Sequence, residues 1–392
     1  MTNKNQVKWS EYLKDVFMCS LGAYGGPEAH YGVFADQLVA KKKYITEEEL
    51  VEFIALTGIL PGPSSTQTLV AIGHKVGGPF LALLTMLVWA LPVLSVMTLL
   101  SFMGQLLFNY NISEDAFRYI GPMAVGFIIV AAWRIGKKVV KDRLTFYLLA
   151  FGAIITYVIR EPWIFPLVLL IGGAVSIFNS KEKELWNPVK LNPPWLYLVA
   201  FGIFAVGSIL LTLTWDNKIV HLFESFYRFG YLVIGGGQVV VPLMYTDLVE
   251  VRQYLTSQEF LTGFGLVQGL PGPMFSFSAY AGGMALRGSG TLIQTAGGMI
   301  SGLAIFLPGL LLIYFIYPIW ENLKKIKGIK VSLNGVTAVA GGLIVTSAFI
   351  LMQKNGFAID NLIILAITII LLLSKKIPAP LIVLGVIIAG FI

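Results

Sequence analysis

Short polar side chains follow a Pro-Gly-Pro tripeptide at two places in the sequence. The first stretch is GILPGPSSTQT (58–68) and the second is QGLPGPMFSFS (268–278). Proline is tolerated at the first position of a helix, because the amide that it lacks has no intrahelical partner there. Each tripeptide therefore predicts that one helix ends and another begins. A helix N-terminus has unpaired N–H groups and about half a positive charge, so it favours the binding of an anion.

The polar residues and glycines around these predicted helix starts form our candidate substrate site. Hydroxyl and amide groups donate hydrogen bonds to an anion, and glycine lets the backbone approach it closely. The candidates are Gly26, Gly62, Ser64, Ser65, Thr66, Gln67, Arg228, Gly236, Gln238, Gly272, Ser276 and Ser278. The alternative is structural, because Pro and Gly are common in membrane helices and Ser and Thr often bond only to their own helix.

Arg228 is the charged member of this set, in the apolar stretch SFYRFGYLVIGGG. An arginine inside a membrane is rare and often functional, and its planar fork suits a tetrahedral oxyanion. The alternative is an ion pair with Glu224, which precedes it by one helical turn.

Glu28 and His30 are our candidates for coupling transport to protons. Glu28 follows Pro27 after a Gly-Gly pair. Burial there would raise its pKa, so that its proton state would gate the binding of a dianion nearby. The alternative is that a carboxylate simply stabilises a helix N-terminus. The three histidines lack the carboxylate or cysteine spacing of a metal site, and we expect neither a metal nor another cofactor.

The elements that must position these residues are strongly apolar. Of the 392 residues, 56% are hydrophobic and only 12% are charged, and the mean hydropathy is +0.79. Such a composition has too few charges to cover a soluble protein and predicts an all-α polytopic membrane protein. The apolar runs predict spans at roughly 79–107, 114–136, 144–159, 163–179, 195–215, 290–317, 331–352, 357–374 and 378–392.

The chain contains an internal repeat. Residues 21–63 align with residues 231–273 at a constant offset of 210, and 12 of the 43 positions are identical. Both Pro-Gly-Pro tripeptides and both Gly-Gly pairs keep the same register. Threonine and glutamate also recur as capping boxes, Thr46 with Glu49 and Thr256 with Glu259. Repeats of this kind are typical of secondary transporters.

The basic loops predict how the copies lie in the membrane. Lysine and arginine gather at 134–143, 181–190, 321–330 and 374–376, and one topology places all four inside. That topology inverts the second copy relative to the first, with interrupted, re-entrant helices meeting near the bilayer midplane. We therefore divide the chain into a first repeat (1–180), a basic linker with a connecting helix (181–218) and a second, inverted repeat (219–392).

The motifs resemble those of the chromate transporter family. The resemblance lies in GGPEAHYGVF, LTGILPGPSSTQTLVAIGHKVGG and the second copy GGGQVVVPLM…LVQGLPGPMFSFSAYAGG, and the two-domain form of the family matches the whole length. It implies a carrier in the cytoplasmic (inner) membrane of a bacterium or archaeon. That carrier would expel chromate, with sulfate as a structural analogue. Met274 and Phe275 replace Ser64 and Ser65, so the two copies are unequal.

The favoured function is a secondary active carrier of oxyanions that works by alternating access. An anion channel and a lipid-phosphate flippase are the alternatives, since interrupted helices and phosphate-binding helix ends suit both. An enzyme is disfavoured, because no nucleophile with an adjacent base is evident. We expect a small inorganic oxyanion and membrane lipid as partners, but no nucleic acid, because the +7 charge gathers in short loops. A homodimer is the commonest symmetric assembly and stays open.

Overall fold

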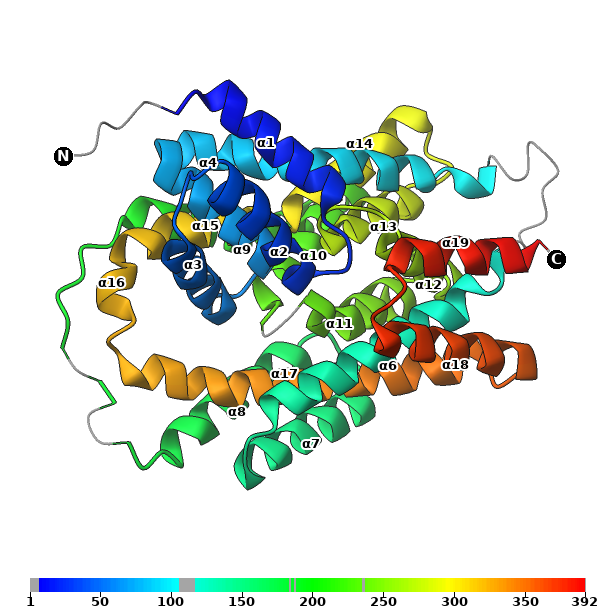
Figure 1. Cartoon of the computed structure of the whole chain (residues 1–392). Coiled ribbons are helices and arrows are strands. Elements are labelled where there is room, and N and C mark those ends of the chain that lie inside the picture. Colours follow the sequence, from blue (N-terminus) through cyan, green and yellow to red (C-terminus); the bar gives the residue numbers. More distant parts are fainter. Residues whose placement is uncertain (1–6, 106–116, 183–184, 187, 235–236, 392) are drawn as a thin grey trace. The chain divides into compact units, whose positions relative to one another are not determined.

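The computed structural model describes residues 7–105, 117–182, 185–186, 188–234 and 237–391. These residues form helices joined by loops, with no β-strand among them (Figure 1). The fold is therefore all-α, as predicted. The chain divides into two compact units. Unit 1 comprises residues 1–101, 193–231 and 270–319, and unit 2 comprises residues 102–192, 232–269 and 320–392.

Unit 1 contains both predicted Pro-Gly-Pro breaks. Its elements are α1 (Trp9–Gly22), α2 (Pro27–Phe34), the π-helix η1 (Ala35–Lys41), α3 (Glu47–Ile59), α4 (Ser64–Leu100), α9 (Trp195–Thr214), α10 (Lys218–Leu232), η5 (Met274–Ser276), α13 (Phe277–Ala285), α14 (Thr291–Ala304), α15 (Leu307–Ile316) and η6 (Tyr317–Ile319). Helix α4 is broken within its length at Gly77 and Gly78, where φ is −152° and +79°. Its first part is thus a separate short helix that starts at the Pro-Gly-Pro break.

Unit 2 is built around one long helix. Its elements are α6 (Ile120–Val139), α7 (Arg143–Val158), α8 (Ile164–Phe178), η3 (Gly237–Val240), α11 (Val241–Tyr245), the π-helix η4 (Thr246–Val251), α12 (Ser257–Gln268), α16 (Trp320–Leu323), α17 (Lys327–Asn355), α18 (Ile359–Ser374) and α19 (Ala379–Gly390). Helix α17 packs against α6, α7 and α8 (Figure 1). The approach to α8 is close because Gly172 faces Gly335, and a side chain at either position would meet the other backbone.

Five helical segments among the described residues are long and apolar enough to cross a membrane. They are Ser64–Leu100, Ile120–Val139, Trp195–Thr214, Thr291–Leu323 and Lys327–Asn355. Four of the predicted spans are shorter apolar helices, namely α7, α8, α18 and α19. Each has fewer than the roughly 20 residues of a full crossing, so the inverted topology stays a prediction.

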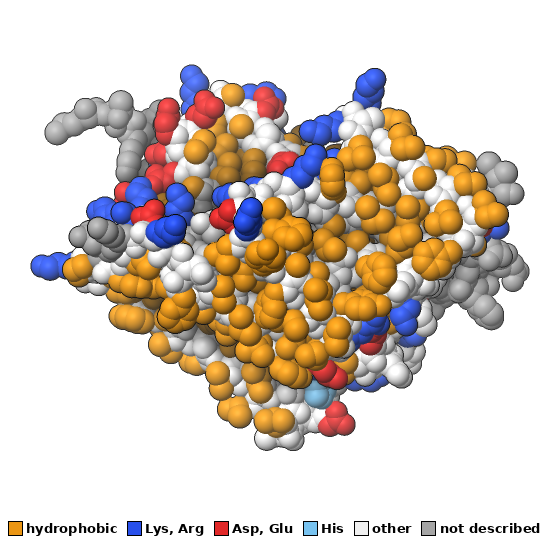
Figure 2. Space-filling model, turned by 90° about the horizontal axis from the view of Figure 1, so that it is seen from below, with side chains coloured by type: hydrophobic (Ala, Val, Ile, Leu, Met, Phe, Trp, Pro, Cys, Tyr) orange, Lys and Arg blue, Asp and Glu red, His pale blue; other side chains and the backbone are white. Residues whose placement is uncertain are grey.

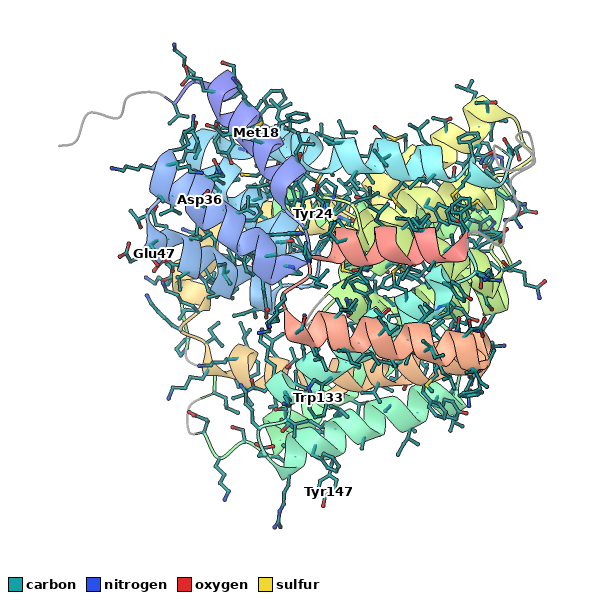
Figure 3. The ribbon with its side chains drawn as sticks, turned by 45° about the vertical axis from the view of Figure 1, so that its right-hand side comes forward. Met18, Tyr24, Asp36, Glu47, Trp133 and Tyr147 are labelled. Carbon is teal, nitrogen blue, oxygen red and sulfur yellow. The ribbon has the colours of Figure 1, made fainter. Side chains whose placement is uncertain are left out.

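Exposed apolar side chains show which surfaces face lipid. Only 6% of the most apolar stretch of α9 is buried, and apolar side chains dominate the face shown in Figure 2. In unit 2, Tyr147 points away from the helices (Figure 3), and the Lys137 ammonium lies 4.4 Å from the ring centre of Trp133. Aromatic and basic side chains together are typical of the membrane interface. The polytopic membrane protein predicted from composition is confirmed.

The structure repeats the local geometry of the sequence repeat. Both capping boxes are formed, at the starts of α3 and α12. A π-helix precedes each of them and is followed by a residue with positive φ, Lys43 at 54° and Gln253 at 53°. Residues 61–70 and 271–280 also have the same order of buried and half-buried positions. The two-repeat layout is therefore present in the fold as well as in the sequence.

The compact units do not coincide with the two sequence copies. Unit 1 combines α4 of the first copy with α13, α14 and α15 of the second, and unit 2 combines α6, α7 and α8 with α17, α18 and α19. The predicted boundaries at residues 180 and 219 thus describe the sequence repeat, while each unit is assembled from both halves.

Candidate functional site

Both helix breaks depend on a glycine in the left-handed region of backbone space. Gly62 has φ of 128° and Gly272 has φ of 100°, and both are buried. Helix α3 ends at Ile59 and α4 begins at Ser64, directly after Pro63. In the second copy, α12 ends at Gln268 and η5 begins after Pro273. A helix thus ends before each tripeptide and another begins after it, as predicted, but each second proline is the N-cap and not the first helical residue.

The first turn of α4 is joined to α2 through buried polar contacts. His30 Nδ1 lies 2.9 Å from Ser65 Oγ, and Trp89 Nε1 donates to Thr66 Oγ1 at 3.1 Å. The His30 and Trp89 rings meet edge to face, with centroids 5.3 Å apart. Pro63, at the N-cap of α4, has no side chain that accepts a hydrogen bond. The first-turn amides therefore keep their capacity to bind an external acceptor.

Three side-chain atoms at the helix starts are buried without a partner among the described residues. They are His30 Nε2, Gln67 Oε1 and Ser276 Oγ, in side chains that are 2%, 1% and 0% exposed. Buried polar atoms are nearly always paired with protein or water, because leaving one unpaired costs about 1–3 kcal/mol. These atoms therefore call for a water or a ligand, and the His30 ring that carries Nε2 contacts the uncapped turn of α4 through Nδ1.

Gln67 is used differently from the prediction that it donates to an anion. Its Nε2 donates to Pro61 O at 2.8 Å and to Gly309 O at 3.5 Å. Its two N–H groups are thereby committed to backbone carbonyls, so Gln67 fixes the break of the first copy against the start of α15. Gly309 was not predicted. It lies in Leu307-Pro308-Gly309, and a sequence signal for it is that Leu-Pro-Gly also occurs at 60–62 and 270–272, in the two breaks.

Each Pro-Gly-Pro break packs against a segment of the other copy. A side chain on Gly309 would come within 3.4 Å of Pro63, and one on Gly272 would come within 3.1 Å of Val93. The Gly272 amide also donates to Ala23 O at 2.8 Å, and the rings of Phe275 and Phe306 lie 6.4 Å apart. Unit 1 therefore contains the starts of α4, η5 and α15 in a mutually packed arrangement.

Arg228 forms an ion pair with Glu224, which the sequence analysis gave as the alternative to substrate binding. Its Nε donates to Glu224 Oε1 at 2.7 Å, and its Nη2 lies 3.4 Å from Glu224 Oε2. The Glu224 side chain is only 8% exposed, so a separated pair would leave a buried charge. The guanidinium fork is thus directed at Glu224, and the hypothesis that it binds substrate is not supported by this geometry.

Glu28 does not meet the condition of the coupling hypothesis, because it is exposed. Burial was the cause proposed for its raised pKa, and the structure does not provide it.

Gly26 is the N-cap of α2, with φ of 91°. The Ser278 hydroxyl donates to Phe275 O within its own helix at 2.7 Å, which is the structural role given above as the alternative.

Two candidates are not among the described residues of unit 1. Gly236 falls outside the described residues. Gln238 belongs to unit 2, and its Oε1 is buried without a partner in the described part of the chain. The local geometry of unit 1 thus brings together Gly62, Ser64, Ser65, Thr66 and Gln67 with His30, and places Gly272 and Ser276 at the second break.

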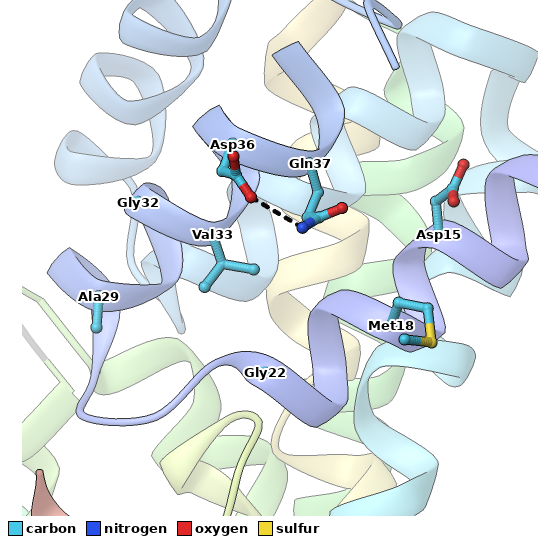
Figure 4. A pocket seen from close by; sticks show the side chains of 8 residues that line it. All are labelled: Asp15, Met18, Gly22, Ala29, Gly32, Val33, Asp36 and Gln37. Atoms are coloured by element: carbon cyan, nitrogen blue, oxygen red, sulfur yellow. Dashed lines mark hydrogen bonds between the residues drawn. The ribbon is translucent and has the colours of Figure 1, made fainter. Parts of the chain in front are cut away.

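An open pocket of about 460 Å³ lies between α1 and the α2–η1 segment (Figure 4). It is lined by Asp15, Met18, Gly22, Ala29, Gly32, Val33, Asp36 and Gln37. Lys42 pairs with Asp15 at 3.1 Å, and Lys41 pairs with Asp36 at 2.7 Å. Carboxylates in the lining make this pocket a poor site for a dianion. No group of three or more His, Cys, Asp or Glu suited to a metal ion occurs in the described ranges.

Long apolar helices, an internal repeat and buried polar helix starts define a multi-pass membrane transport protein. A family model described as "Chromate transporter" matches residues 10–177 and again residues 220–391. The chain therefore belongs to the chromate transporter family, and it is a multi-pass protein of the cytoplasmic membrane. The two matches correspond to the two sequence repeats.

Several curated proteins resemble the chain along most of its length. A probable chromate transport protein of Synechococcus elongatus is 26% identical over 380 residues, which cover 96% of this chain and 94% of that protein. The chromate transport protein of Cupriavidus metallidurans is 26% identical over 371 residues, covering 94% and 89%. An uncharacterized transporter of Bacillus subtilis is 27% identical over 169 residues, covering 42% of this chain and 83% of that protein. No solved structure matches.

Proposed function

We propose that this protein is a secondary active transporter that expels chromate, with sulfate as a structural analogue, by alternating access. The anion binds in unit 1 at the first turn of α4, where the amides of Ser64, Ser65 and Thr66 and the Nε2 atom of His30 donate to its oxygens. The observation that carries the proposal is the buried, unpaired His30 Nε2 beside a helix start that has no side-chain cap. The relatives named as chromate transport proteins support chromate as the cargo.

A charge-neutral site of this kind suits alternating access. The binding groups are backbone amides, hydroxyls and an imidazole, so the anion is held by dipoles and leaves no buried cation behind when it departs. The membrane potential supplies a driving force, since an inside-negative potential favours the exit of an anion by about 2.3 kcal/mol per charge per 100 mV. Export therefore needs no ATP-binding motif, and none occurs in the sequence.

Transport by the purified protein in proteoliposomes tests the proposal. Labelled chromate is offered under an imposed potential, with sulfate as competitor and protein-free liposomes as control. We expect saturable uptake that depends on the potential and is reduced by sulfate. Failure to transport any oxyanion would refute the proposal. Uptake that does not saturate would indicate an anion channel, and movement of a labelled phospholipid between leaflets would indicate a flippase.

A further inference from the structure

The side chain of Gln67 presents an unpaired acceptor at the start of α4. Gln67 is 1% exposed, and its Oε1 is buried without a partner among the described residues. The hydrogen bonds of the Gln67 amide group decide which of its two ends is the nitrogen. Nε2 donates to Pro61 O and Gly309 O, whereas a rotated amide would turn its oxygen toward both carbonyl oxygens. The atom of Gln67 that is left for a ligand is therefore a hydrogen-bond acceptor.

His30, which contacts the first turn of α4 through Ser65, leaves this conclusion unchanged in either tautomer. When Nδ1 accepts from Ser65 Oγ, Nε2 carries a hydrogen and is an unpaired donor. When Nδ1 donates to Ser65, Nε2 becomes a second unpaired acceptor. The site thus offers donors from the first-turn amides of α4 and at least one buried acceptor, Gln67 Oε1. A ligand that satisfies the whole site must itself bring both acceptors and a donor.

We infer that the site prefers a tetrahedral oxyanion that carries a proton, such as hydrogen chromate or dihydrogen phosphate, over a fully ionised one such as sulfate. The inference rests on the proposed function and specifies its substrate class. The hydroxyl of the ligand donates to Gln67 Oε1, and its remaining oxygens accept from the amides and from His30. Sulfate carries no proton at neutral pH and cannot donate a hydrogen bond to Oε1. It would place an oxygen lone pair next to Oε1 and leave this buried acceptor unsatisfied. Sites built to bond a hydroxyl reject analogues that lack it.

The acceptor belongs to the first copy alone. At the offset of 210, the position equivalent to Gln67 is Phe277, which is buried and apolar. Ser65 likewise corresponds to Phe275. The contact between Ser65 and His30 therefore has no counterpart in the second copy. The second copy thus has no counterpart of the Gln67 acceptor at the equivalent position.

Competition by two tetrahedral anions tests the inference. Chromate uptake by proteoliposomes is measured at neutral pH with sulfate or phosphate as competitor, for the wild type, Gln67→Met and Gln294→Met. Gln294 is the matched control, because it is also a buried glutamine of unit 1 and donates from Nε2 to a backbone carbonyl, that of Ser101. The ratio of the two inhibition constants is the readout, since a general loss of structure lowers transport without changing that ratio.

We expect phosphate to compete better than sulfate in the wild type and in Gln294→Met. In Gln67→Met the preference should fall by roughly tenfold or more, as expected for removal of the partner of a buried hydrogen bond. Equal competition in the wild type, or an unchanged ratio in Gln67→Met, would overturn the inference. If Gln67→Met fails to transport, the Tm of the wild-type protein is measured with sulfate and with phosphate instead. Equal increases in Tm with the two anions would also overturn the inference. Absence of any oxyanion transport would instead refute the proposed function.

Discussion

At the scale of single residues, the account depends on a few buried polar atoms that lack a partner within the described part of the chain. His30 Nε2, Gln67 Oε1 and Ser276 Oγ are all in unit 1 and all lie within a turn or two of a helix start. Native proteins rarely leave such atoms unpaired, so each of them calls for a water or a ligand. The charged candidates contribute less, because Arg228 is engaged by Glu224 and Glu28 is exposed.

Replacing His30 tests its role as a donor. His30→Phe keeps an aromatic ring against Trp89 but removes both ring nitrogens. We expect the KM for chromate to rise by roughly tenfold or more, because a hydrogen bond to a charged group contributes about 1.5–3 kcal/mol. The control is His74→Phe, in which a half-buried ring packs against Tyr314 and Tyr317. Equal transport constants for both variants would remove His30 from the site.

At the scale of elements, the breaks in the helices are imposed by the backbone. Gly62 adopts a conformation that residues with a side chain rarely take, and a Cβ there would lie 2.6 Å from Gln67 Nε2. The same glycine thus sets the turn and leaves room for the side chain that fixes it. The break and its support by Gln67 are parts of one local structure.

Gly62→Ala is expected to destabilise the protein by about 1–3 kcal/mol through backbone strain and the clash with Gln67. The comparison is Gly58→Ala, one turn earlier in α3, where a Cβ would meet no atom within 4 Å. That change should be neutral or stabilising by up to about 1 kcal/mol, because alanine favours a helix. Thermal unfolding in detergent measures both. A Gly62→Ala variant as stable as Gly58→Ala would contradict the strain that we assign to this turn.

The sequence predicted the elements whose causes are local. The capping boxes, the Pro-Gly-Pro breaks and the ion pair of Arg228 with Glu224 (as an alternative) all follow from residues within a few positions of each other. The partners of Gln67 could not be predicted in this way, since Gly309 is 242 positions further along the chain. The contact between His30 and Ser65 likewise depends on how α2 packs against α4.

At the scale of the whole molecule, the two halves of the chain are interleaved. Each compact unit is built from segments of both sequence copies, so neither copy forms a unit by itself. The alignment of residues 21–63 with 231–273 predicted the repeat but not this exchange, because the exchange arises from long-range packing such as that of α17 on α7 and α8.

Expression of the two halves as separate chains tests this interleaving. Residues 1–186 and 187–392 each contain one copy, and the cut falls in the basic linker. We expect either half alone to aggregate, since α4 would lack α13–α15 and α17 would lack α6–α8. Together they should co-purify and restore chromate transport. A single half that folds stably as a monomer would argue that the packing between copies is dispensable.

The most direct test of the central claim is to locate a bound oxyanion in an experimental structure. Selenate or molybdate, which share the tetrahedral shape of chromate, can be found by their anomalous scattering. The account predicts a peak within hydrogen-bond distance of the amides of Ser64, Ser65 and Thr66 and of His30 Nε2. A peak at Arg228 or on surface lysines, with only protein atoms filling the space before the first turn of α4, would contradict it.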